Sequence, residues 1–154
     1  MKAEILKSIQ SLCREYRIDS LYVFGSRAKE VFQYVRGTGR MDNRYGSDVD
    51  MGVLTATGVR LSERDRVRLT IDLENLFGVR RVDLVILPEA SPFLALEVIQ
   101  GELLFTAAPD ETAEYELYVL RRAGDLAYFE RQRRHQILTG KFHDTFNASR
   151  KNHR

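Results

Sequence analysis

The spacing of apolar and polar positions predicts a chain in which helices alternate with short strands. Apolar side chains recur at helical intervals over residues 2–16, and the four apolar residues 21–24 form a strand-like run. A helix follows from residue 27 and extends towards residue 35, and a second strand covers residues 47–54. We therefore expect an α/β protein, with a small mixed β-sheet and helices packed on it.

The second half of the chain continues the same alternation. Ser62-x-x-Asp65 resembles a capping box and opens a helix to about Phe77, after which Gly78 is a natural terminator. Residues 80–87 are apolar on both faces, which favours a buried central strand. A short helix from Ser91-Pro92, an edge strand over 102–106 and a long helix from 109 to about 135 complete the prediction.

One glycine turn, one lysine and three acidic residues carry the candidate chemistry. Gly25-Ser26 joins a strand to a helix, so its backbone N–H groups can approach a phosphate at the helix N-terminus. We expect Ser26 to cap that helix and to donate its hydroxyl to a phosphate. Lys29, one turn further, can reach the phosphates as a point charge.

Asp48 and Asp50 are two residues apart on a predicted strand, so they share one face with Cα atoms roughly 6–7 Å apart. Carboxylates this close repel each other unless a cation lies between them, and Mg²⁺ prefers such oxygen ligands. Asp83 interrupts the apolar strand 80–87. It either pairs with a cation such as Arg81 or belongs to the same site.

These motifs, Gly25-Ser26 followed by a helix and then Asp48-x-Asp50, resemble the signature of the DNA polymerase β-like nucleotidyltransferases. In its short length the chain resembles the minimal nucleotidyltransferases (MNT), which include the antitoxins of HEPN/MNT toxin–antitoxin pairs. The resemblance covers roughly residues 1–135 and implies the nucleotidyltransferase fold, with Asp83 as the third carboxylate. Two departures stand out. The family usually has Arg-Gly where this chain has Lys29-Glu30, and residues of about 31–46 look like an insertion.

The resemblance implies a Mg²⁺-dependent enzyme that transfers AMP from ATP to a tyrosine of a cognate HEPN toxin, as the antitoxin of a type VII-like system. Asp48 and Asp50 would bridge two Mg²⁺ ions, Asp83 would hold the catalytic one, and Gly25, Ser26 and Lys29 would hold the phosphates. Two alternatives remain open. In the first, the chain is a non-catalytic antitoxin that masks the toxin. In the second, it is a small-molecule transferase that acts on an antibiotic.

Length and composition change this interpretation little. A chain of 154 residues is one domain, and we place its folded part at 1–138 and a disordered polar tail at 139–154. A net charge of +2 is too small to imply direct nucleic-acid binding. No apolar run is long enough for a membrane span, and no signal peptide or disulfide framework is apparent, so we expect a cytoplasmic protein.

Overall fold

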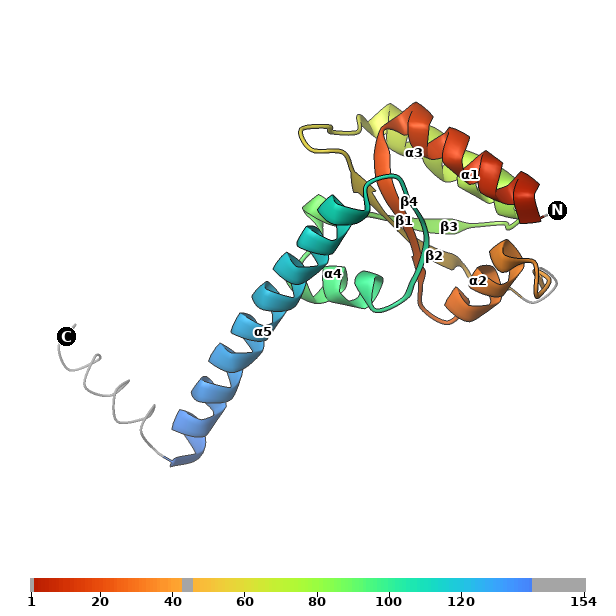
Figure 1. Ribbon diagram of the computed structural model, residues 1–154. Coiled ribbons are helices and arrows are strands. Elements are labelled where there is room, and N and C mark those ends of the chain that lie inside the picture. Colours follow the sequence, from red (N-terminus) through yellow and green to blue (C-terminus); the bar gives the residue numbers. More distant parts are fainter. Residues whose placement is uncertain (1, 43–45, 140–154) are drawn as a thin grey trace.

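A computed structural model describes residues 2–42 and 46–139, with helices on both faces of one β-sheet (Figure 1). Most of the tail predicted for residues 139–154 lies outside the described residues. The elements in chain order are α1 (Lys2–Tyr16), β1 (Ile18–Phe24), α2 (Ala28–Arg36), β2 (Val49–Thr55), α3 (Glu63–Phe77), β3 (Val82–Ile86), the 3-10 turn η1 (Leu87–Glu89), α4 (Pro92–Ile99), β4 (Glu102–Thr106) and α5 (Pro109–Thr139).

The sheet is mixed, as the sequence predicts. Its strand order is β3-β2-β1-β4, with β1 antiparallel to both β2 and β4 and with β2 parallel to β3. The edge position predicted for β4 is confirmed, but the central position predicted for β3 is wrong. Helices cover both faces of this edge strand: Val82 and Ile86 pack into the cluster that contains α3, while Val85 packs against the cluster that contains α4. Apolar residues on both faces therefore reflect two helical layers rather than two flanking strands.

The side chains of the central strands divide between two apolar clusters. The larger cluster joins α1, α2 and α3 to one face of the sheet and includes Leu21, Val23 and Met51. The smaller cluster joins α4 and α5 to the other face through Tyr22 and Phe24. Because side chains alternate along a strand, Asp50 shares the face on which α4 packs, while its neighbours in β2 enter the larger core.

Local signals in the sequence fix the ends of two helices as expected. The Ser62 hydroxyl accepts a hydrogen bond from the backbone N–H of Asp65 at 3.1 Å, and Gly78 ends α3 with a positive φ of 65°. Ser91 caps α4 in the same way, accepting from the N–H of Leu94 at 3.3 Å. These contacts satisfy N–H groups that the first helical turn leaves without partners.

Helix α5 packs on α4 with its first half and then extends away from the body (Figure 1). Val119 and Ala123 are buried, and the Tyr115 hydroxyl donates to the carbonyl of Leu87 at 3.0 Å. From residue 124 to residue 135 no side chain is buried. Across the described residues, no helix combines the length and the apolarity that crossing a membrane requires.

Candidate functional site

The strand register brings the predicted acidic residues to one place. Asp50 pairs with Phe24 of β1 on one side and with Asp83 of β3 on the other. Gly25 directly follows Phe24, so the predicted phosphate turn adjoins Asp50. Asp48 lies just before β2 on the same side of the sheet. The fold therefore places the turn and the three carboxylates next to one another.

The carboxylates interact electrostatically. Burial raises the pKa of Asp50, and the nearby negative charges of Asp83, Asp48 and Glu97 raise it further, as does a hydrogen bond with Asp83. Each of these effects disfavours the ionised form of Asp50. A cation at this point would relieve the repulsion, because it would offset the negative charge of several carboxylates at once.

The three carboxylates are a donor set that suits a hard metal ion by its chemistry. Among residues 2–42 and 46–139, no three His, Cys, Asp or Glu side chains already converge into a metal-binding group. The chemistry of the donors nevertheless fits Mg²⁺, since Asp48, Asp50 and Asp83 offer only hard carboxylate oxygens, and Asp48 and Asp83 raise the pKa of Asp50. These residues would hold the metal ion.

Gly25 occupies a position that only glycine suits. Its φ is +79°, and a Cβ atom built there would lie 2.4 Å from Oδ2 of Asp50. A side chain would thus strain the turn and displace the central carboxylate. The sequence predicts that Gly25 allows close approach to a phosphate, and the structure adds that Gly25 also lies close to Asp50.

Of the two roles predicted for Ser26, the structure contradicts the helix cap, and the phosphate contact stays a prediction. Helix α2 begins at Ala28, so its N-cap is Arg27, which makes no side-chain cap hydrogen bond. The predicted cap by Ser26 is therefore wrong, because this serine lies one residue too early. Its side chain is exposed, with Oγ 3.5 Å from Oγ of Ser47. Lys29 is also exposed, in the first turn of α2.

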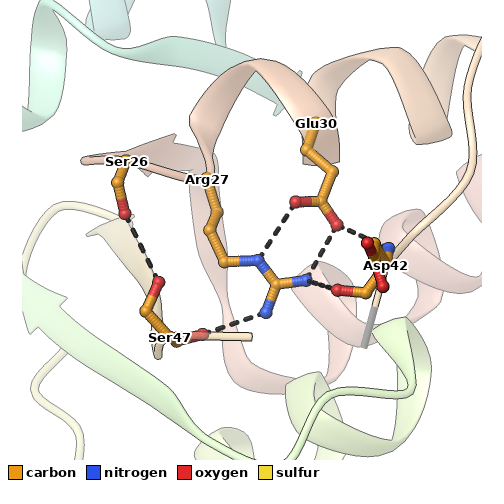
Figure 2. A network of polar contacts seen from close by, with 5 residues as sticks. All are labelled: Ser26, Arg27, Glu30, Asp42 and Ser47. Carbon is orange, nitrogen blue, oxygen red and sulfur yellow. Dashed lines mark hydrogen bonds and ion pairs between the residues drawn. The ribbon is translucent and has the colours of Figure 1, made fainter. Parts of the chain in front are cut away.

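Arg27 is a buried residue that the sequence analysis missed. Figure 2 shows its guanidinium between α2 and the segment that leads into β2. It donates to the carbonyls of Ser47 at 2.9 Å and Asp42 at 2.8 Å, and to the Glu30 carboxylate at 2.8 and 3.2 Å. A Cβ on Gly46 would lie 2.4 Å from Nη1. Arg27 therefore links the end of the Gly25-Ser26 turn to the segment that leads into β2, by hydrogen bonds to the carbonyls of Asp42 and Ser47.

Glu30, where the chain departs from the family pattern, belongs to this network. Its Oε2 also accepts the backbone N–H of Asp42 at 2.7 Å, so it anchors part of the insertion (Figure 2). The hydrogen bonds from Arg27 lower the pKa of Glu30. The Arg-x-x-Glu spacing was visible in the sequence, but the two carbonyl partners in the loop were not. Residues 43–45 of the insertion lie outside the described residues.

Two further acidic contacts refine the site. Asp83 is exposed, so it does not need the buried ion pair considered for it, and Arg81 instead places Nε 4.0 Å from Oδ2 of Asp48. Glu97 on α4 contributes to the field at Asp50, although no motif marks it. The packing of α4 against the sheet places Glu97 near Asp50, which the sequence alone does not indicate.

A glycine turn after one strand and carboxylates on the two neighbouring strands define a domain of the nucleotidyl-transferring class. The chain belongs to the polymerase β nucleotidyltransferase family, whose family model "Polymerase beta, Nucleotidyltransferase" matches residues 7–110. No curated protein matches the sequence.

Solved structures show the same fold. A chain of the toxin–antitoxin MntA–HpeT, in a mutant form, is 24% identical, with a TM-score of 0.56, over 85% of this chain and 93% of that one. A chain of a toxin–antitoxin solved with AMP-PNP is 25% identical, with a TM-score of 0.53, over 85% and 94%. A third belongs to a complex of tri-AMPylated Shewanella oneidensis HEPN toxin with MNT antitoxin. It is 23% identical, with a TM-score of 0.54, over 89% and 96%.

Proposed function

We propose that this protein transfers AMP from ATP to a hydroxyl group of a partner protein, with Mg²⁺ as cofactor. The observation that carries the proposal is the position of Asp50, between the Gly25 turn and Asp83. A nucleotide phosphate bound at the Gly25-Ser26 turn would lie beside the carboxylates. A divalent cation at that point can bind the phosphate and the carboxylates together.

In the proposed reaction, the acceptor oxygen attacks the α-phosphorus of ATP. The bond from that phosphorus to the oxygen bridging to the β-phosphate breaks, and pyrophosphate leaves. Asp83 takes the proton of the hydroxyl group, while Gly25, Ser26 and Lys29 bind the β- and γ-phosphates. Asp48, Asp50 and Asp83 would hold two Mg²⁺ ions, whose positive charge would stabilise the attacking and leaving oxygens.

The partner we propose is a cognate HEPN toxin, with one of its tyrosines as acceptor, and the protein would then be the antitoxin. The support is the resemblance in fold to an MNT antitoxin in complex with an AMPylated HEPN toxin. A nucleotide analogue in a second similar structure supports ATP as the donor.

The second candidate is an antitoxin that only masks its partner. The Arg27–Glu30–Asp42 network favours it mildly, because this network fixes part of the insertion beside the site. The carboxylate cluster argues against it, since clustered acids that serve no ligand only weaken a fold. A small-molecule transferase is less well supported, because the three similar structures described above are of toxin–antitoxin proteins.

The test is to incubate the protein with Mg²⁺, labelled ATP and the product of the neighbouring reading frame. We expect that partner to gain the mass of one or more AMP groups when the protein is present in catalytic amounts. Asp83→Asn should abolish the adduct, and Asp125→Asn, an exposed change on α5, should not.

The masking function predicts a different outcome. Inhibition of the partner would then need a stoichiometric complex and would survive Asp83→Asn. Neutralisation without an adduct on the partner would overturn the proposed transfer.

A further inference from the structure

A groove runs along β3 beside the candidate site. It has a volume of about 480 Å³ and lies between α3 on one side and η1 with the start of α4 on the other. Its lining includes Asp83, so the groove and the site share a residue. Val67 and Ile71 of α3 face it and are unusually exposed for apolar residues, at 59% and 48%. Arg66 and Glu89 pair between its two walls.

The floor of the groove is the unpaired edge of the sheet. β3 is an outer strand, and no strand within residues 2–42 and 46–139 pairs with its far side. Val49 donates to the carbonyl of Arg81, and Val49 pairs with Val82 in register. In a parallel ladder this pattern turns the backbone groups of residues 83 and 85 towards β2 and those of Leu84 and Ile86 outward.

One end of this edge is already satisfied. The outward N–H of Val82 donates to the Glu74 carboxylate at 3.0 Å. At the other end, Ile86 is the N-cap of η1, so its carbonyl accepts the first hydrogen bond of that turn. The outward backbone groups that remain are the N–H and C=O of Leu84 and the N–H of Ile86, and both residues line the apolar groove. Only another extended backbone offers donors and acceptors at a matching repeat.

We propose that the acceptor segment of the partner binds here as an extended strand added to the free edge of β3. This inference rests on the proposed function, because it assigns the place where the acceptor hydroxyl enters. An added strand lies about 4.8 Å from β3, and its side chains alternate between the two faces of the sheet. A residue beside Asp83 would point to the carboxylates, and its two neighbours in the segment would point towards Val67 and Ile71.

This geometry also specifies the substrate. The segment carries a hydroxyl residue with an apolar residue immediately before and after it, because those flanking side chains meet the apolar wall of α3. Mass spectrometry that locates the labelled residue of the partner tests the pattern directly. A labelled residue with charged neighbours on both sides would contradict it.

The main experiment measures AMP transfer by Ile71→Arg. Leu103→Arg is the matched control, because Leu103 is an exposed apolar residue, 37% exposed, on β4 at the opposite edge of the sheet. We expect Ile71→Arg to raise KM for the partner at least tenfold while KM for ATP stays within twofold. Leu103→Arg should leave both values unchanged.

Hydrogen exchange separates docking from catalysis. On addition of the partner, the amide of Leu84 should become protected, while that of Val82, already bonded to Glu74, should change little. Protection of Leu84 without any AMP transfer would reject the proposed function but keep the docking site. Transfer with unchanged KM in Ile71→Arg, or with Leu84 unprotected, would overturn the docking site and leave the proposed function standing.

Discussion

At the scale of single residues, Asp50 is a carboxylate that the fold holds among other carboxylates. Burial raises its pKa in the folded protein, and its acidic neighbours raise it further, above the value of about 3.9 for an unfolded chain. The folded state therefore binds the proton more tightly than the unfolded state does. Stability falls as the pH rises from the unfolded pKa through the raised folded pKa, and the full cost remains at neutral pH.

We predict that Asp50→Asn raises the Tm at pH 7 without Mg²⁺, and that the gain disappears as the pH approaches the unfolded pKa. Thermal unfolding across this pH range measures both effects. Mg²⁺ should stabilise the original protein and not the variant, since the ion replaces the missing positive charge. Asp125→Asn on the exposed part of α5 is the control, and an equal gain there would refute the explanation.

The residues of the site differ in how far the sequence reveals them. Asp48, Asp50 and Asp83 could be predicted to meet, because strand periodicity and the family pattern fix their faces. Arg27 could not be predicted, since two of its partners are backbone carbonyls of a loop with no regular pattern. Glu97 could not be predicted as a neighbour of Asp50 either, because the packing of α4 on the sheet brings the two together.

At the scale of elements, the Arg27 network joins the start of α2 to the segment before β2. We predict that Arg27→Lys lowers stability by about 1–3 kcal/mol, because an ammonium group cannot serve both carbonyls and Glu30 in the same geometry. AMP transfer should fall as well, since Ser47 leads directly into Asp48. Denaturant unfolding and the labelling assay measure the two effects.

The control for this prediction is Arg36→Lys, an exposed change at the end of α2. It should alter stability by less than about 0.5 kcal/mol. Equal effects of the two substitutions would mean that the network does not position the acidic strand.

The position of β3 marks the limit of sequence patterns for elements. Capping residues located α3 and α4 correctly, because their contacts are local. Strand order is a non-local property, and a strand covered by helices on both faces has the same apolar pattern at the edge as at the centre of a sheet. That ambiguity has a functional consequence, since the free edge of β3 is the docking surface proposed above.

At the scale of the whole molecule, the fold consists of a body and a helix that leaves it. The first half of α5 holds the sheet through several contacts: Thr112 is buried with its hydroxyl beside that of Ser20, and Val119 lies in the smaller cluster. Beyond Ala123 no side chain as far as residue 135 is buried. The sequence predicted the helix but not where its packing stops, because apolar residues such as Tyr128 and Phe129 continue along it.

We predict that a chain ending at Arg131 keeps its Tm within about 2 °C, because the side chains of residues 124–135 are not buried and the last buried ones, Val119 and Ala123, are retained. A chain ending at Tyr118 should instead lose about 2–4 kcal/mol, since it lacks the buried side chains of Val119 and Ala123. ATP binding, measured by calorimetry, should survive the first truncation, because Gly25, Asp50 and Asp83 lie in the body. A large loss of stability in the chain ending at Arg131 would show that the projecting half of α5 belongs to the folded unit.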